Sequence, residues 1–192
     1  NADDIRDDLR QYVIEAFSDP DAVLVVDETG DIKKGTKTVG VQRQYSGTAG
    51  RVENCQVMVC MTYTSRRGHA LIDRALYLPK SWTDDPARCA EAGVPGAIEF
   101  ATKPALATAM ILGAFDAAFP FGWVAGDEVY GADPDLRTTL QDRQIGYVLA
   151  IGCDRRISTE AGLHPVSDLA AALPESTWQA LSAGAGAKGP RM

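Results

Sequence analysis

The sequence predicts an α/β fold in which a mixed sheet is flanked by helices. Extended runs separated by short turns fill the first half after an opening helix, and helices alternate with apolar strands in the second half. The 192 residues are 45% hydrophobic and 23% charged, which suits one globular domain. No apolar run approaches the roughly 20 residues that cross a bilayer. No signal-peptide pattern opens the chain, so we expect a cytoplasmic protein with no membrane partner.

The first elements are a helix and a strand. Residues 4–17 are predicted to be helical because apolar residues recur there every four positions, at Ile5, Leu9, Val13 and Phe17. Residues 22–26 are continuously apolar and rich in valine, which is typical of a strand buried on both faces. This strand is expected to end at Asp27, before a turn that contains Gly30.

Three further extended runs cover residues 38–45, 54–64 and 69–78. Short turns at residues 47–50 and 65–68 join them, so antiparallel neighbours are the economical arrangement.

The second half alternates helix and strand. A helix is predicted over residues 98–119, a strand over 121–126, a helix over 134–143 and a strand over 146–151. Asp133 is a plausible N-cap of the second of these helices, with Pro134 at its first position. The domain division that follows is a leading helix (1–20), a core (21–153) and an irregular or inserted segment (154–192).

Asp27 and Asp127 are the candidate metal ligands. Each carboxylate follows an apolar strand and precedes a glycine-containing turn, and carboxylate oxygens suit Mg²⁺ or Mn²⁺. Metal-assisted phosphoryl transfer would use such a pair. The alternative role for both residues is capping of a turn. Glu28 and Glu128 follow the two aspartates, but neighbouring side chains of a strand point to opposite faces, so neither is expected to bind the same metal.

The order of elements is that of a ribonuclease H-like fold. In that fold the first and fourth strands are neighbours in the sheet, so Asp27 and Asp127 are expected to meet although 100 positions separate them.

Other catalytic chemistries lack support. The four cysteines show no C-x-x-C spacing and are expected to be reduced thiols, and neither histidine lies near a cysteine pair that could bind zinc. No serine or cysteine forms a recognisable motif with a histidine, so a nucleophilic hydrolase is not indicated.

Charge is unevenly distributed. The net charge of −7 argues against a simple nucleic-acid binder, but residues 31–80 contain nine basic and three acidic residues. A basic segment of this kind could follow a phosphate backbone, or it could be a solvated hairpin without a partner. The candidate DNA-backbone contacts are Lys33, Lys34, Lys37, Arg43 and Arg51.

Short sequence words along the chain resemble one transposase family. They are VVDETG at 25–30, KKGTK at 33–37, VGVQRQYSG at 39–47, NCQ at 54–56, LYLPKSW at 76–82, AGDEVYG at 125–131 and GAKGPR at 186–191. Together they resemble DDE-type insertion-sequence transposases, in particular the family numbered seven hundred and one. The resemblance covers nearly the whole chain.

The resemblance implies a function. Members of this family cleave and join DNA phosphodiesters with two divalent metals, Mg²⁺ or Mn²⁺, and Asp27 and Asp127 match two of their three acidic ligands. The third ligand, a glutamate, is expected after the glycine-rich stretch at 184–191, which makes the fold incomplete at the C-terminus. The chain is therefore expected to be inactive, or nearly so, by itself. The implied partners are transposon ends and target DNA, and a homo-oligomer is compatible with the family.

Two alternatives stay open. The chain could be a non-catalytic remnant that binds DNA or a transposase partner through its basic segment. It could also be another ribonuclease H-like nuclease that completes its site with an acid from residues 154–175, where the candidates are Asp154, Glu160, Asp168 and Glu175.

Overall fold

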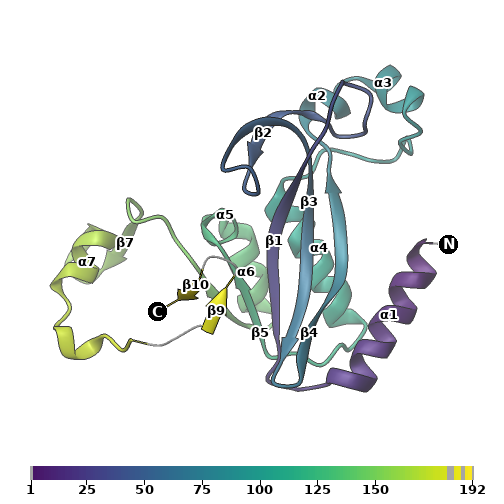
Figure 1. Cartoon of the computed structure of the whole chain (residues 1–192). Helices are drawn as coiled ribbons and strands as arrows, with labels where there is room; N and C mark the ends of the chain where they lie inside the picture. Colours follow the sequence, from purple (N-terminus) through teal and green to yellow (C-terminus); the bar gives the residue numbers. More distant parts are fainter. Residues whose placement is uncertain (1, 181–183, 187–188, 192) are drawn as a thin grey trace. The chain divides into compact units, whose positions relative to one another are not determined.

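The computed structural model describes residues 2–180, 184–186 and 189–191 (Figure 1). The chain divides into two units, residues 1–151 and residues 152–192, and each is described by itself. Within the described residues, no helix has the length and apolar character needed to cross a membrane.

A six-stranded mixed sheet forms the centre of the first unit. Its strands are β1 (Val23–Ile32), β2 (Gln42–Ser46), β3 (Arg51–Ser65), β4 (Gly68–Tyr77), β5 (Trp123–Gly126) and β6 (Gly146–Leu149). The order is β2-β3-β1-β5-β6, and β4 also pairs with β3. The pairings among β1 to β4 are antiparallel, whereas β5 is parallel to both β1 and β6. The two strands that lead to Asp27 and Asp127, β1 and β5, are therefore neighbours, as in a ribonuclease H-like fold.

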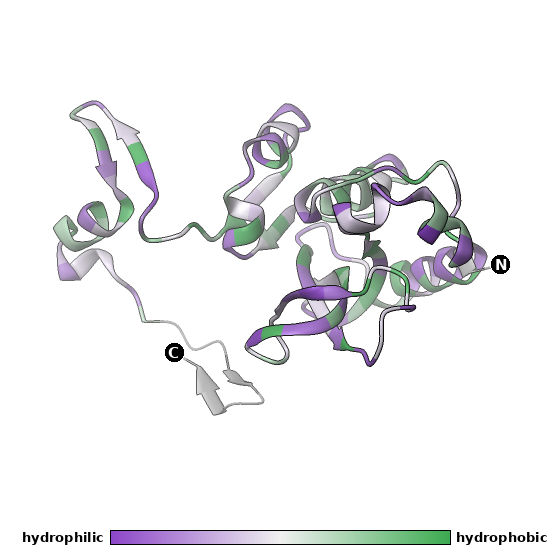
Figure 2. Cartoon of the chain, turned by 90° about the horizontal axis from the view of Figure 1, so that it is seen from above, coloured by the Kyte–Doolittle hydropathy of each residue, from purple (hydrophilic) through white to green (hydrophobic). Residues whose placement is uncertain are grey.

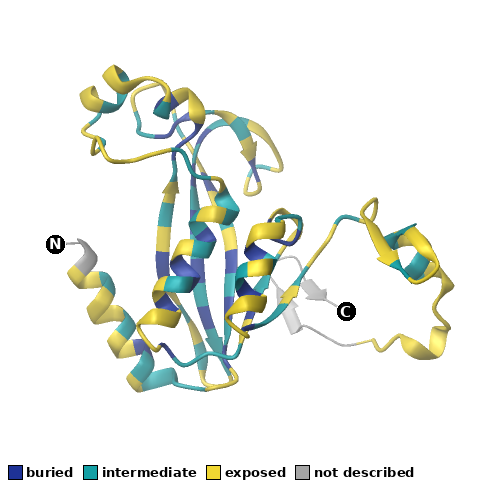
Figure 3. Ribbon diagram, turned by 180° about the vertical axis from the view of Figure 1, so that it is seen from behind, coloured by how far each residue is buried: buried dark blue, intermediate teal, exposed yellow. Residues whose placement is uncertain are grey.

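Helices cover one face of this sheet. They include α4 (Lys103–Asp116) and α6 (Pro134–Asp142), which lie on the same side in the view from behind (Figure 3). The core between helices and sheet contains Leu24, Val26, Met61, Tyr63 and Ile111, all nearly inaccessible to solvent. Burying these apolar side chains is the main stabilising contribution to the unit.

The opposite face of the sheet is more open than the sequence predicts. Along β1, Leu24 and Val26 are buried while Val23 and Val25 are only half-buried. On the neighbouring strands of that face, the side chains of Trp123 and Val148 are 46% and 68% exposed. The expectation that residues 22–26 are buried on both faces is thus wrong for the described part of the chain, because the packed helices supply only one apolar layer.

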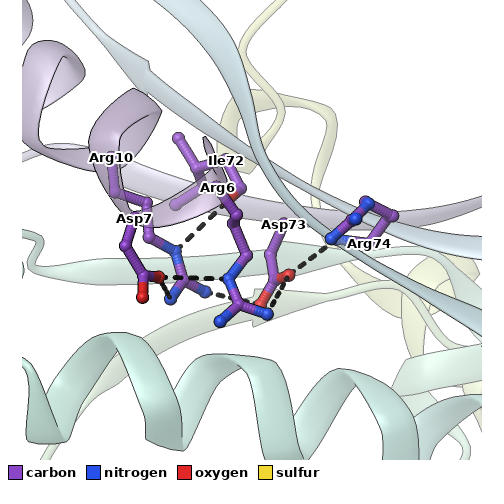
Figure 4. Close-up of polar contacts among 6 residues, drawn as sticks. All are labelled: Arg6, Asp7, Arg10, Ile72, Asp73 and Arg74. Carbon is purple, nitrogen blue, oxygen red and sulfur yellow. Dashed lines mark hydrogen bonds and ion pairs between the residues drawn. The ribbon is translucent and has the colours of Figure 1, made fainter. Parts of the chain in front are cut away.

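The opening helix α1 (Ala2–Phe17) carries both hydrophobic and hydrophilic residues (Figure 2). Val13 is buried against the sheet, but an ion-pair cluster also attaches the helix to β4 (Figure 4). Asp73 is only 7% exposed, and its Oδ2 lies 2.5 Å from Arg10 Nη2. Arg10 Nε donates a second hydrogen bond to the carbonyl of Ile72 at 3.2 Å. The buried carboxylate therefore has the close cationic partner that its burial requires.

The boundaries of several elements differ from the predictions. β1 continues five residues past Asp27 to Ile32, because β3 pairs with it as far as Cys55. Gly30 therefore lies within a strand and not in a turn. Residues 38–41 are not a strand, and Gly40 has a positive φ of 76° there.

The helical predictions are also partly corrected. α4 begins at Lys103 instead of residue 98, since Thr102 caps it by accepting a hydrogen bond from Ala105 N. In the first unit three short helices were not anticipated, namely α2 (Lys80–Thr83), α3 (Pro86–Glu91) and α5 (Glu128–Gly131). The predicted cap of α6 is confirmed, since Asp133 Oδ1 accepts a hydrogen bond from Leu136 N at 2.8 Å.

The second unit contains small elements. They are β7 (Arg156–Thr159), β8 (Gly162–Pro165), α7 (Val166–Ala172), the 3₁₀ helix η1 (Glu175–Thr177), β9 (Gly184–Gly186) and β10 (Gly189–Arg191). β7 pairs with β8, and β9 pairs with β10. The glycine-rich word at 186–191 includes positions 187 and 188, which lie outside the described residues.

Candidate metal centre

Asp27 and Asp127 follow paired positions of two parallel strands. Val26 of β1 is the register partner of Gly126 of β5, so the next residue of each segment is an aspartate. Gly126 permits this close approach, because a Cβ there would lie 3.1 Å from both Val26 Cγ2 and Tyr130 Cβ. The fold therefore brings together the two carboxylates that the sequence analysis singled out.

Each carboxylate uses one oxygen in a local hydrogen bond. Asp27 Oδ1 accepts from the Glu28 amide at 2.8 Å, and Asp127 Oδ1 accepts from the Val129 amide at 2.9 Å. The second bond makes Asp127 the N-cap of α5. Among the described residues no group donates a hydrogen bond to the other oxygen of either carboxylate, and both residues are exposed. Each aspartate thus has one oxygen free to bind a cation.

The electrostatics of Asp27 favour a bound positive charge. Desolvation by the surrounding chain raises the pKa of Asp27 above its ordinary value, and the negative charges of Asp127 and Glu28 raise it further. The hydrogen bond from the Glu28 amide and the charge of Lys103 act in the opposite direction. A negative charge on Asp127 therefore disfavours the ionised form of Asp27.

Glu28 points to the helix-covered side and already has two partners. Its Oε1 lies 2.6 Å from Lys103 Nζ, and its Oε2 accepts a hydrogen bond from Tyr130 Oη at 3.1 Å. The side chains of Glu28 and Lys103 are 16% and 21% exposed, and Tyr130 is fully buried. Glu128, in contrast, is exposed at the start of α5. Glu28 therefore does not share the open face of Asp27.

Sequence reasoning missed Lys103 and Tyr130. Burial raises the pKa of Tyr130 far above its ordinary value, and the charge of Glu28 adds to the effect, so the hydroxyl stays a hydrogen-bond donor. The available signals were positional: Tyr130 lies three residues after Asp127, and Lys103 precedes Pro104 at a helix start. Neither signal names Glu28 as the partner.

Cys60 is the register partner of Asp27 on β3. Burial raises the pKa of the Cys60 thiol, and the charge of Asp27 raises it further. At neutral pH Cys60 is therefore a neutral thiol beside the carboxylates, and a thiol is a weak ligand for Mg²⁺ or Mn²⁺.

The described residues contain no group of three or more acidic, histidine or cysteine side chains that could hold a metal. Among the described residues, the two aspartates would therefore supply only part of a metal's ligands. Asp154, Glu160, Asp168 and Glu175, which were considered as a third acid, all belong to the second unit.

The five basic candidates are not equally available. Lys37 Nζ lies 2.6 Å from Glu91 Oε1, Arg51 Nε lies 2.7 Å from Glu53 Oε1, and Lys33 pairs with Asp31. Lys34 and Arg43 are exposed and have no ion-pair partner within the described chain. Any polyanion would meet these last two charges without displacing a carboxylate.

Comparisons with known proteins agree with this architecture. Residues 1–171 match the model of a family described as DDE superfamily endonuclease. Over 144 residues the chain is 26% identical to a probable transposase for insertion sequence element IS701 from Microchaete diplosiphon. That match covers 73% of this chain but only 34% of the relative, so the chain spans about a third of the relative's length. No solved structure gives a significant match. The chain thus belongs to the DDE superfamily endonucleases, and its mixed sheet is consistent with a ribonuclease H-like fold.

Proposed function

We propose that this chain forms part of the catalytic domain of a DNA transposase and that Asp27 and Asp127 bind its divalent metal, Mg²⁺ or Mn²⁺. The observation that carries the proposal is the parallel pairing of Val26 with Gly126, which leads both aspartates to the same end of the sheet. Family membership supplies the reaction class, an endonuclease acting on DNA.

The protein's own contribution would be to hold two anionic oxygens at a fixed site. Each aspartate is oriented by a backbone amide through Oδ1, which leaves Oδ2 for the cation. Bound divalent ions would activate the attacking water or 3′-hydroxyl and stabilise the leaving oxygen of the phosphodiester. With two carboxylates from this chain, we propose weak metal binding and little or no cleavage by the chain alone.

The DNA backbone would be contacted by the basic segment, namely Lys33, Lys34, Lys37, Arg43 and Arg51. Lys34 and Arg43 are proposed as the main contributors, because the other three would first have to exchange a carboxylate for a phosphate. Such contacts position a duplex without reading its sequence.

Metal titration tests the proposal. Isothermal titration of Mn²⁺ into the 192-residue chain should show saturable binding, and Asp27→Asn or Asp127→Asn should each weaken it at least about tenfold. Asp31→Asn is the matched control, because Asp31 is an exposed carboxylate on the same strand that pairs with Lys33. Its affinity should change less than about twofold. Unchanged binding in both site variants would overturn the assignment.

The second candidate is a non-catalytic DNA-binding role. It is favoured by Lys34 and Arg43, which are exposed and have no ion-pair partner among the residues that the structure describes. A gel shift separates the two functions. Salt-sensitive DNA binding without any dependence on metal or on Asp27 would favour the non-catalytic role. Magnesium-dependent nicking that is lost in Asp27→Ala would instead show that the chain is an active nuclease, and would contradict the expected inactivity.

A further inference from the structure

We infer that Glu28 is a positioning residue whose carboxylate, held by Lys103 and Tyr130, fixes the two aspartate-bearing segments relative to each other. The inference rests on the proposed metal-binding role of Asp27 and Asp127. It concerns side chains that would not touch the metal.

One carboxylate connects three elements. Glu28 directly follows Asp27 in β1, and Tyr130 belongs to α5, the helix that Asp127 caps. The 3.1 Å hydrogen bond from Tyr130 Oη to Glu28 Oε2 therefore links the neighbour of one aspartate to the helix of the other. Lys103, the first residue of α4, binds the second oxygen at 2.6 Å. Both oxygens of Glu28 are thus engaged by residues far away in the sequence.

The surroundings make these contacts more effective than surface contacts. Tyr130 is inaccessible to solvent, and the Glu28 and Lys103 side chains are mostly covered. The exposed pair Lys37–Glu91 offers a contrast, with side chains that are 80% and 65% exposed. Water and salt compete strongly for an exposed pair but weakly for a covered one. The contacts of Glu28 with Lys103 and Tyr130 can therefore keep β1, α4 and α5 in fixed relative positions.

The second aspartate needs such support. The pairing of β5 with β1 ends at Gly126. Asp127 therefore lies just beyond the paired strand, at the start of a four-residue helix. Without a cation the two carboxylates repel each other, as the effect of Asp127 on Asp27 indicates. A hydrogen bond from α5 to the residue after Asp27 opposes their separation.

If Lys103 acted only through its charge, its removal would change metal affinity in the opposite direction. The direction of the change therefore distinguishes the two roles. Removing the positive charge of Lys103 would make the site more negative, and charge alone would then tighten cation binding. If Lys103 instead holds Glu28 in place, Lys103→Met should weaken binding. Tyr130→Phe changes no charge and removes only the hydroxyl, so any effect on metal affinity reports the hydrogen bond.

The test is isothermal titration of Mn²⁺ into the wild-type chain and its variants. Lys103→Met and Tyr130→Phe should each weaken Mn²⁺ binding about tenfold, as outer-shell substitutions typically do. Lys103→Arg should retain most of the affinity, because it restores a cation at Glu28. Glu128→Gln is the matched control: it removes a carboxylate next to the other aspartate, but an exposed one, and should change affinity less than about twofold.

A metal-free double-mutant cycle checks the link independently. Glu28→Gln and Tyr130→Phe should be non-additive in urea unfolding, with a coupling of at least about threefold in the unfolding equilibrium constant. Additive effects would overturn the inference, and so would tighter or unchanged Mn²⁺ binding in Lys103→Met. Failure of the wild-type chain to bind Mn²⁺ would overturn the proposed function itself. Normal wild-type binding with unaffected Lys103 and Tyr130 variants would overturn this inference alone.

Discussion

The chain contains two Asp-Glu dipeptides at the same end of one sheet, and their glutamates have different surroundings. Glu28 is mostly buried between Lys103 and Tyr130, whereas Glu128 is exposed. The aspartates before them lie side by side after paired residues of β1 and β5. The two aspartates thus occupy equivalent positions, whereas the two glutamates do not.

The backbone that follows each aspartate explains the difference. β1 continues as a strand to Ile32, so Glu28 turns to the face opposite Asp27, where α4 packs. β5 ends at Gly126, and Asp127 instead caps α5, which places Glu128 in the first turn of a helix. The element that follows each aspartate therefore decides whether the neighbouring glutamate packs beneath the helices or faces solvent.

The largest expected effect is a loss of stability on substitution of Gly131, the glycine that follows the second dipeptide. A Cβ on Gly131 would lie 1.8 Å from the Ala150 carbonyl oxygen, which is backbone at the end of β6 and cannot move away easily. Gly131→Ala should therefore destabilise the fold by at least about 3 kcal/mol.

Gly30 offers the matched substitution on the other side. A Cβ there would lie 2.6 Å from Ser46 Oγ, which can rotate, and 2.9 Å from Ser46 Cβ, which requires a small shift of β2 at the edge of the sheet. Gly30→Ala should therefore cost about 1–2 kcal/mol. Urea unfolding of both variants measures the difference. Equal stabilities would show that α5 and the end of β6 adjust as readily as an edge strand.

An intermediate effect is expected for the glutamates themselves. Glu28→Ala leaves the buried Tyr130 hydroxyl and the covered Lys103 ammonium without their partner, so the free energy of unfolding should fall by about 2 kcal/mol. Glu128→Ala removes an exposed side chain and should stay within about 0.5 kcal/mol of the wild type. Thermal and urea unfolding of the two variants compare them directly. A similar loss of unfolding free energy in both variants would show that the buried contacts of Glu28 do not stabilise the fold.

The smallest effect depends on pH and concerns Asp27. Its pKa in the folded chain is raised above the ordinary value of 3.8, chiefly by desolvation, so its protonated form is the one that folding favours. That contribution to stability is complete below the ordinary pKa and is lost as the pH rises through the raised pKa. At pH 7 without metal, Asp27→Asn should therefore unfold about 1–3 °C above the wild type, a small shift because the group is exposed.

The pH series supplies the control for this prediction. At pH 3 the wild-type and Asp27→Asn proteins should unfold at the same temperature, because Asp27 is then protonated in both folded and unfolded states. Mn²⁺ at pH 7 should raise the unfolding temperature of the wild type more than that of Asp27→Asn. A difference between the two proteins that does not change with pH would show that ionisation is not its cause.

The sequence was informative wherever a local pattern determines the structure. Apolar runs predicted the strands that precede Asp27 and Asp127, and the Asp133-Pro134 pair predicted the start of α6. The length of β1 was not predictable, because the partner strand β3 keeps it extended through Gly30. The contacts of Glu28 reach 75 and 102 positions along the chain, to Lys103 and Tyr130. Periodicity and spacing carry no information about such distant partners.

The ten-residue ladder between β1 and β3 has a consequence for motion at the two aspartates. Asp27 lies in the middle of this ladder, where amide hydrogen exchange requires disruption of the central sheet. Asp127 lies outside any ladder, on a one-turn helix that can open while the sheet stays intact. We therefore expect slower amide exchange at Asp27 than at Asp127, where opening of α5 would first have to break the hydrogen bond between Tyr130 and Glu28.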